Sequence, residues 1–367
     1  MKIYIISEQV GLEGYWITDI LDGIAKESLK KNITVADYDG SAIDLSSEAP
    51  RPIVLAIGYS MHWMQKTCEE LKNNNVLPIL VNADNGLVAE MIGPIGTVSF
   101  GVRRAVYDVL SYLIAIKRSK IALFGAHLDV YSDDIKTEEF LRLVNYWGLK
   151  IGTEDIYRSG SINSCFEKLK PFIEKYNAIF CTSDAAASFL IEKLHDLGIR
   201  VPQDIAIIGF GGSRFAEKFS PAISTVENNY VELGRQAVKL HQLLQKNTDI
   251  NSASISVDCP LVLRSTTPGV TPSKNFLTKK VEGKIPKYDA DPIFLQALMA
   301  EELLKNWDDI DKAIAFGLIN GKTVVSIADG LYISVSAVKY RIKKMLVGTD
   351  LKNKNDLIKL IKKFNLI

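Results

Sequence analysis

The stretch AIFCTSDAAASFLIEKLHDLGIRVPQDIAIIGFGG, residues 178–212, specifies a strand, a helix and a second strand. The run from Ala178 to Thr182 is short and apolar. It leads to Asp184, whose side chain can cap the helix that we expect from Ala185 to Gly198. A second apolar run, Ile205 to Gly209, then ends in further glycines. Two buried strands joined by a helix are typical of parallel βαβ units.

The same alternation extends on both sides of this stretch. The expected strands are 2–7, 33–38, 53–58, 77–82, 97–100, 120–125 and 260–265, and the expected helices are 15–30, 61–73, 105–117, 135–147, 162–176 and 230–245. Two α/β blocks, with the last of these helices returning toward the first block, indicate two parallel-sheet subdomains that enclose a cleft. We therefore expect an α/β protein with two lobes, followed by a small all-α domain.

Composition limits the class of protein. The 367 residues suffice for about two or three domains, and no apolar run approaches the roughly 20 residues that span a membrane. The N-terminus lacks the features of a signal peptide, so we expect a cytoplasmic protein with no membrane partner. The four cysteines stand singly, which predicts neither disulfides nor a zinc site, and no metal or other cofactor is expected.

Charge is distributed unevenly along the chain. From Lys322 to the end, ten lysine and arginine residues accompany three aspartates and leave a net charge of about +7, whereas the whole chain carries only +1. The remainder is therefore net acidic. A basic module on an acidic body fits a nucleic-acid reader joined to another domain, although lysine-rich tails also serve solubility.

The basic part contains GKTVVSIADGLYISVSAVKYRIKKML, residues 321–346, which predicts two short helices joined by a tight turn. The turn falls at 331–333, and Ser334 can cap the second helix, which we expect over 335–346. That helix has an apolar back and a cationic front. Its cationic residues are Lys339, Arg341, Lys343 and Lys344. Periodicity alone would also fit a helical hairpin with a solvated lysine face, but the order of turn, cap and basic helix favours a DNA reader.

This segment resembles the LuxR-type helix-turn-helix found at the C-terminus of many transcription regulators. The matching positions are Gly321, Ile327-Ala328, Ile333-Ser334, Val338-Lys339, Asn353-Lys354 and Leu357-Ile358. The sequence departs at Ser326 and Ala337, where that family usually has glutamate and threonine. The resemblance implies a DNA-binding domain over about 290–367. The residues it places against DNA are Lys339, Tyr340 and Lys343 in the major groove and Ser334, Ser336 and Lys344 on phosphates.

The larger part of the chain is similar to the effector domain of the lactose-repressor family, which itself resembles periplasmic sugar-binding proteins. The matching positions are Asp184, Ala187, Gly198, Arg200-Val201-Pro202, Asp204-Ile205, Gly209-Phe210, Pro221, Thr225-Val226 and Arg264-Ser265-Thr266. The resemblance covers about 1–267 and implies lobe 1 over about 1–101 and 228–254 and lobe 2 over about 102–227 and 255–267. A linker is expected over 268–289. Repressors of that family begin with a DNA-reading element, whereas the first strand here begins at Lys2, so we expect the C-terminal element to supply the reader.

Open α/β sheets bind ligands at the loops that follow their strands, and polar and aromatic residues occupy those loops here. Aromatic faces stack on the CH surfaces of sugars while charged groups bind the hydroxyls. The candidate ligand-binding residues are Glu8, Tyr15, Trp16, Tyr59, Trp63, Tyr131, Asp133, Lys136, Asp184, Phe210 and Arg214. Each aromatic residue could instead belong to a core, and Asp184 could serve only as a helix cap.

Two departures from the lactose-repressor pattern concern the ligand. Gly211 stands where that family usually has an aspartate, and Lys136 stands where it usually has an arginine, whose planar bidentate contact a lysine cannot make. Our main hypothesis is a ligand-responsive, DNA-binding transcription regulator that binds a sugar or sugar derivative and forms a homodimer. The alternative is a regulator with a degenerate, ligand-free sensor that acts as a dimerisation or protein-interaction module. No nucleophile, phosphate loop or metal motif favours an enzyme.

Overall fold

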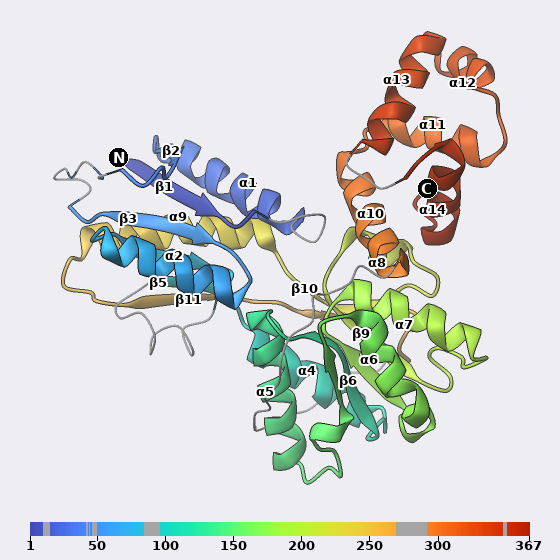
Figure 1. The fold of residues 1–367 in the computed structure, drawn as a ribbon, viewed down its shortest axis with the longest axis horizontal. Coiled ribbons are helices and arrows are strands. Elements are labelled where there is room, and N and C mark those ends of the chain that lie inside the picture. The colour runs from blue at the N-terminus through green and yellow to red at the C-terminus, as the bar shows by residue number, and fades with distance from the viewer. Residues whose placement is uncertain are drawn as a thin grey trace.

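The computed structural model describes residues 1–9, 15–41, 43, 45, 50–83, 96–268, 292–347 and 351–367. These residues form two α/β lobes and a group of C-terminal helices that lies beside the second lobe (Figure 1). Within this part of the chain no helix is long and apolar enough to cross a membrane.

Lobe 1 is built on a six-stranded sheet in the order β11-β5-β4-β3-β1-β2, with every neighbouring pair parallel. Its elements are β1 (Lys2–Ser7), α1 (Tyr15–Lys30), β2 (Thr34–Asp37), β3 (Ile53–Ile57), α2 (Met61–Asn73), β4 (Leu77–Val81), β5 (Gly96–Phe100), α9 (Tyr230–Lys246) and β11 (Ala253–Val257). The side chains of β3 are all buried, as expected for a central parallel strand that is covered on both faces.

Lobe 2 is built on a second six-stranded sheet in the order β12-β10-β9-β8-β6-β7, parallel except for β12. Its elements are α4 (Val102–Ala115), β6 (Ile121–His127), α5 (Tyr131–Tyr146), η2 (Thr153–Asp155), β7 (Ile156–Ser159), α6 (Ile162–Leu169), η3 (Lys170–Lys175), β8 (Ala178–Cys181), α7 (Asp184–Asp196), β9 (Ala206–Gly211), α8 (Arg214–Lys218), β10 (Ser224–Glu227) and β12 (Leu261–Val262). The prediction of two parallel-sheet α/β subdomains is therefore confirmed.

Some boundaries differ from the sequence-based prediction. The chain passes between the lobes after β5, after β10 and after β11, and β11 pairs with β5 as far as Val257. The predicted lobe boundary at residue 254 is therefore wrong, because it falls inside a strand of lobe 1. The helix predicted over 162–176 ends at Leu169 and continues as a 3-10 helix that contains Pro171. Proline lacks the amide that an α-helix interior requires.

Helices α1 and α9 cover one face of the lobe 1 sheet and meet through two glycines. A Cβ at Gly23 would lie 2.0 Å from the carbonyl oxygen of Val231, and one at Gly234 would lie 2.1 Å from that of Ile20. The absence of a side chain at both positions lets the backbones of the two helices approach closely. This contact fixes α1, which carries several residues of the cleft, against α9.

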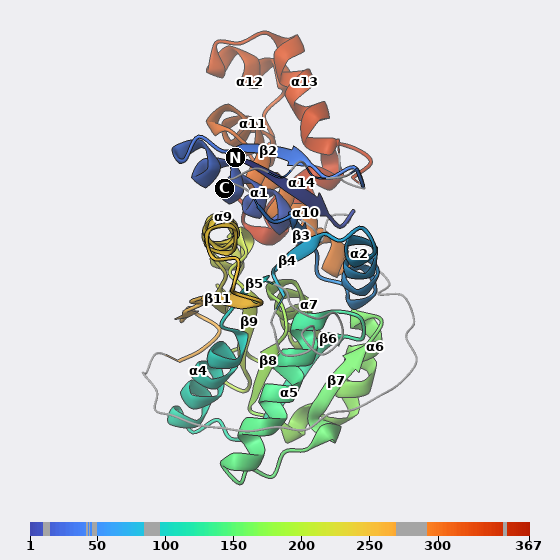
Figure 2. The ribbon, with the colours of Figure 1, turned by 90° about the vertical axis from the view of Figure 1, so that its left-hand side faces the viewer.

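The C-terminal helices are α10 (Pro292–Asn306), α11 (Asp309–Ile319), α12 (Val324–Leu331), α13 (Val335–Leu346) and α14 (Lys354–Phe364). We refer to residues 292–347 and 351–367 as the helical module. Its core is continuous with that of lobe 2, because one cluster of buried side chains includes Phe189 and Ile207 of lobe 2 and Leu298 and Phe364 of the module. Figure 2 shows α4 and α5 of lobe 2 at the end far from the module. The linker predicted over 268–289 lies outside the described residues, apart from Pro268.

Candidate ligand cleft and nucleic-acid interface

The loops that follow β3 in lobe 1 and β6 in lobe 2 touch each other where the two lobes meet. Ser60 and Val130 form an antiparallel bridge, the amide of Tyr131 donates to the carbonyl of Tyr59 at 3.4 Å, and the amide of Met61 donates to that of Asp129 at 3.4 Å. Both loops stand at the carboxyl ends of their parallel strands, where open sheets bind ligands. The lobes are thus in contact at one side of the candidate site.

Four aromatic rings of lobe 1 pack together beside this contact. The ring of Trp16 stacks on Tyr230 with centroids 5.8 Å apart and meets Tyr59 edge-on at 6.0 Å. Phe100 in turn meets Tyr230 edge-on at 5.2 Å. Trp16 and Tyr59 were predicted for the site, and Tyr230 and Phe100 were missed. Both missed residues flank chain crossings between the lobes, a position that could have identified them.

Glu8 is engaged within lobe 1. Its carboxylate accepts hydrogen bonds from the amide of Tyr59 at 2.8 Å, from the amide of Ser60 at 3.2 Å and from the hydroxyl of Ser60. The same serine caps α2 by accepting from the amide of Trp63 at 3.3 Å. Glu8 therefore holds the loop that presents Tyr59 to the cleft, and Trp63 packs in the first turn of α2 against Gly58.

Lys136 and Asp133 form a buried ion pair in the first turns of α5. The ammonium of Lys136 lies 2.7 Å from Asp133 Oδ1, 3.0 Å from the carbonyl oxygen of Thr182 and 3.3 Å from the hydroxyl of Ser132. These three acceptors match the three donors of an ammonium group. The same ammonium lies 4.4 Å from the ring centre of Phe210, in a cation–π contact.

Asp184 joins α7 to the glycine-rich loop after β9. Its Oδ2 accepts from the amide of Ser213 at 2.7 Å and from the hydroxyl of Ser213 at 2.9 Å, and only 2% of the residue is exposed. Burial raises the pKa of this carboxyl. The helix cap is Ser183, which accepts from the amide of Ala186, rather than Asp184 as predicted. A Cβ at Gly209 would lie 2.3 Å from Asp184 Oδ1, so the glycine makes room for the carboxylate.

The remaining predicted site residues begin different helices. Tyr131 is the first residue of α5 and is buried, and Tyr15 begins α1. Arg214 begins α8 and points away from the Asp184 group, toward α1 and α10: it donates to Asp19 at 3.0 Å and to Glu301 at 2.8 Å. Sequence reasoning placed Arg214 with the ligand because the helix α8 behind the loop was not predicted.

The cleft residues therefore divide by chemistry. Glu8, Asp133, Lys136 and Asp184 are bonded to their own lobe, whereas the aromatic rings pack against one another, with Trp16 and Phe100 buried. Asp133 and Lys136 neutralise each other, whereas the carboxylates of Glu8 and Asp184 accept from neutral amides and hydroxyls.

The second candidate site is the α12–α13 pair of the helical module. Thr323 caps α12, Tyr332 adopts the left-handed conformation at φ 54° in the turn, and Ser334 caps α13 through the amide of Ala337 at 3.0 Å. The predicted cap at Ser334 is confirmed. The turn places the two helices side by side, with Val338 and Ile342 buried between α13 and the rest of the module.

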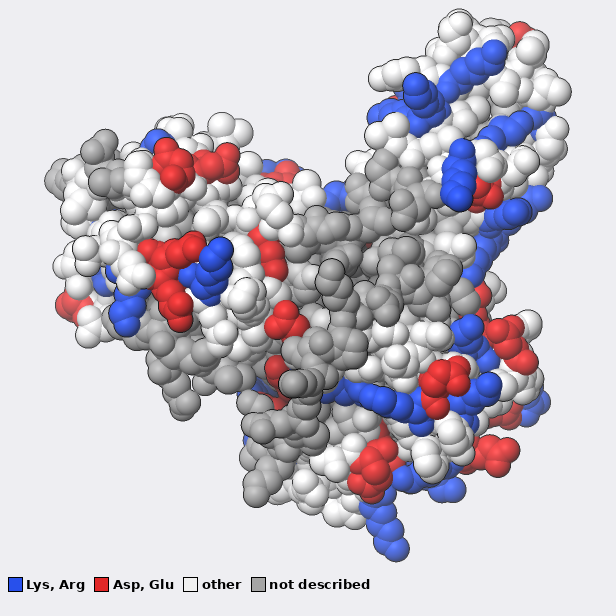
Figure 3. Space-filling view, viewed as in Figure 1, with Lys and Arg blue, Asp and Glu red and all other residues white. Residues whose placement is uncertain are grey.

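The opposite face of α13 is polar and exposed. Its exposed residues are Ser334, Ser336, Lys339, Tyr340, Lys343 and Lys344. Arg341 differs from the prediction, because its guanidinium lies 2.7 Å from Asp311 and 2.8 Å from Asp308 at the start of α11. It fixes α13 to α11 and is not part of the exposed front. Figure 3 shows lysine and arginine side chains spread over the module, with few carboxylates on the face in view.

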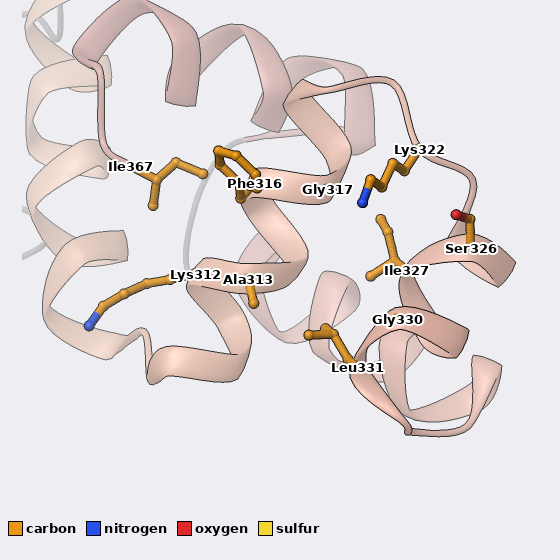
Figure 4. Close-up of a pocket in the computed structure, with 10 residues that line it drawn as sticks. All are labelled: Lys312, Ala313, Phe316, Gly317, Lys322, Ser326, Ile327, Gly330, Leu331 and Ile367. Atoms are coloured by element: carbon orange, nitrogen blue, oxygen red, sulfur yellow. The ribbon is translucent and has the colours of Figure 1, made fainter.

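A pocket of ≈ 400 Å³ lies between α11 and α12 (Figure 4). Its lining residues are Lys312, Ala313, Phe316, Gly317, Lys322, Ser326, Ile327, Gly330, Leu331 and Ile367. No residue of α13 lines it, so it lies apart from the exposed lysines of that helix.

The two-lobed fold is that of a periplasmic-binding-protein-like domain, and the comparisons agree. Residues 110–267 match the family model of the periplasmic binding protein-like domain. A putative LacI-type transcriptional regulator from Bacillus cereus subsp. cytotoxis has the same fold, with a TM-score of 0.58, 18% identity, and coverage of 73% of this chain and 99% of that one. The transcriptional regulator CelR in complex with cellobiose gives a TM-score of 0.57 with 14% identity, over 72% of this chain and 84% of that one.

Among curated proteins, the chain is 25% identical over 164 residues to the transcriptional repressor PurR of Vibrio vulnificus, which covers 44% of this chain and 49% of PurR. It is 25% identical over 203 residues to catabolite control protein A of Staphylococcus aureus, which covers 54% of this chain and 60% of that protein. The chain thus spans about half the length of these relatives.

Proposed function

We propose that the protein is a ligand-responsive transcription regulator whose two-lobed part binds a small molecule and whose helix α13 binds DNA. The observation that carries this proposal is the exposed face of α13: lysines 339, 343 and 344 project from a capped helix whose apolar face is buried in the module. A positive helix that can enter the major groove, with hydroxyls at its N-terminal end for phosphates, is the arrangement of a LuxR-type helix-turn-helix reader.

The two-lobed part supports a sensing role. The curated relatives include a transcriptional repressor and a catabolite control protein, and one solved relative is in complex with cellobiose. The aromatic rings of Trp16, Tyr59 and Tyr230 suit the CH faces of a carbohydrate, and the mutual pairing of Asp133 and Lys136 leaves neither charge for a ligand. We infer an uncharged sugar or sugar derivative as the effector. The regulator would act in the cytoplasm as a homodimer, because one small reader contacts too few base pairs for useful specificity.

The proposed DNA binding is tested by measuring how tightly the full chain binds fragments of its source genome. Lys339→Ala combined with Lys343→Ala should weaken binding at 150 mM salt by about tenfold or more, since each lysine removes a contact to a phosphate or a base. The matched control is Lys359→Ala combined with Lys362→Ala on α14, which removes the same charge from two exposed positions of another helix. Equal binding by the α13 variant and wild type would show that α13 is not the reader.

The proposed ligand binding is tested by measuring the melting temperature in the presence of a panel of neutral monosaccharides and disaccharides. A ligand present at 100 times its Kd stabilises the protein by about 2.7 kcal/mol and raises the melting temperature. Trp16→Leu should abolish the shift. Trp147→Leu should retain it, because Trp147 lies at the far end of α5, beside Tyr107.

A second candidate function follows from the same contacts. Because Lys136, Asp133 and Glu8 are already bonded within their lobes, the two-lobed part can be stable without any ligand. In that case it serves as a dimerisation or protein-interaction module. A panel of sugars that leaves the melting temperature unchanged, together with DNA binding that persists, would favour this second function.

A further inference from the structure

One carboxylate of lobe 1 is shared between lobe 2 and the helical module. Asp19 lies on α1 with its side chain 20% exposed, and its two oxygens accept from Arg214 at 3.0 Å and from Lys305 at 3.4 Å. Arg214 begins α8 of lobe 2, and Lys305 lies in the last turn of α10. Three separate parts of the fold therefore meet at Asp19.

The helical module is fixed to lobe 2 by stronger contacts than these. Glu301 of α10 is 1% exposed, accepts from the amide of Phe215 at 2.9 Å and from Arg214 at 2.8 Å, and so binds the start of α8. The ring of Phe364 of α14 packs on Phe215 with centroids 5.7 Å apart. A second ion pair joins Lys363 of α14 to Glu192 of α7 at 2.9 Å. Lobe 2 and the module therefore behave as one body.

Lobe 1 is joined to that body by a buried core that it shares with α4 and α5 of lobe 2 and by three chain crossings, after β5, β10 and β11. Hinge closure between domains uses connections of this kind. Among the described residues, the ion pairs that tie lobe 1 to α8 and α10 converge on Asp19. Both α1 and α8 follow the carboxyl ends of strands, so the Asp19–Arg214 pair joins the two lobes on the side where open sheets bind ligands.

We propose that Asp19 couples the angle between the lobes to the helical module, by holding Arg214 of lobe 2 and Lys305 of α10 only when the cleft is closed. This mechanism rests on the proposed function, because it explains how ligand binding in the cleft controls the DNA reader. Opening the cleft carries Asp19 away from both cations, so that lobe 1 loses its ion pairs to α8 and α10 while Arg214 stays paired with Glu301. A ligand that favours the closed lobes favours the arrangement in which α10 is held.

The proposal predicts which parts of the molecule move together, and distances between spin labels measure this without DNA or effector. One label pair joins lobe 1 to the module at Leu29 and Val325, and a second joins lobe 2 to the module at Phe172 and Val325. All three side chains are more than half exposed. The four native cysteines are buried, so cysteines introduced at these positions can be labelled selectively.

Asp19→Asn should broaden the distances of the lobe 1 pair and leave those of the lobe 2 pair unchanged. The open population should rise about fivefold, which corresponds to about 1 kcal/mol for two partly exposed ion pairs. Lys305→Gln should give a smaller increase. Asp22→Asn is the matched control, since Asp22 lies one turn along α1 and pairs with Lys26 of the same helix. Distances in Asp19→Asn that equal those of wild type, or a lobe 2 pair that broadens equally, would overturn the proposal.

A second measurement tests the regulatory part. The genomic fragment bound by wild type is titrated with the Asp19→Asn protein, and its affinity should change by about the same factor as the open population. Broadened distances with unaltered DNA affinity would overturn the coupling role of Asp19. Absence of DNA binding by wild type would instead contradict the proposed function, and the distance measurement would still decide whether Asp19 holds the lobes.

Discussion

Replacement of Asp184 separates a structural role for this residue from a role in ligand binding. In the structure its buried carboxylate accepts two hydrogen bonds from Ser213, at 2.7 Å from the amide and 2.9 Å from the hydroxyl. Asp184→Ala removes both and leaves the Ser213 amide buried without this acceptor, which costs about 1–3 kcal/mol for the amide alone. The loss of the hydroxyl bond adds about 1 kcal/mol, and relief of the desolvated carboxylate offsets part of the total.

We therefore expect Asp184→Ala to lower the free energy of unfolding of lobe 2 by about 2–3 kcal/mol, and Ser213→Ala, which removes only the hydroxyl bond, by about 1 kcal/mol. The double variant should be less destabilised than the sum of the single variants, because the hydroxyl bond is lost only once. Urea unfolding gives the free energies, and hydrogen exchange at the amide of Ser213 reports the bond directly. If Asp184→Ala unfolds at the wild-type urea concentration and only ligand binding is lost, the structural role is refuted.

Three further predictions concern stability. Burial lowers the pKa of His241 to about 4 in the folded protein. The stability that the neutral imidazole contributes is therefore present above about pH 6.5 and is lost as the pH falls toward 4. In urea titrations, His241→Gln should reduce the loss of unfolding free energy between pH 7 and pH 5 by about 2 kcal/mol. Gly234→Ala should destabilise lobe 1 by about 1–3 kcal/mol in calorimetry, because its Cβ would lie 2.1 Å from the carbonyl oxygen of Ile20. Arg341→Ala should lower the melting temperature of the helical module, because Asp311 is 1% exposed and loses its ion partner. Lys339→Ala should leave that melting temperature unchanged, and circular dichroism measures both.

Local signals in the sequence predicted the fold well wherever one segment determines its own structure. The all-apolar strand β3 and the serine cap of α13 agree with expectation, because burial on both faces and the free amides of a helix start require those residues. The short strands β7, β10 and β11 were missed, since four or five residues with polar side chains among them carry little periodicity. The cap of α7 was assigned one residue late, because serine and aspartate at neighbouring positions can each accept from the same amides.

The side chains of the cleft were harder to predict than its position. The loops at the carboxyl ends of the strands were identified, but the sequence does not show whether a charged residue there bonds to its own lobe. The pair Asp133–Lys136 had a local signal, since residues three apart on a helix are neighbours. Arg214 had none, because its partners Asp19 and Glu301 lie 195 and 87 residues away. Contacts of that range depend on how whole elements pack.

Photo-crosslinking at Tyr340 tests the assignment of α13 as the DNA reader most directly. Tyr340 is 69% exposed on the lysine-bearing face of α13, and Phe172 of lobe 2 is 57% exposed and serves as the control position. p-Benzoylphenylalanine in place of Tyr340 should crosslink to a bound genomic fragment under light, and the same residue in place of Phe172 should not. A protein that binds DNA without crosslinking at Tyr340, or that crosslinks equally at Phe172, would contradict the account.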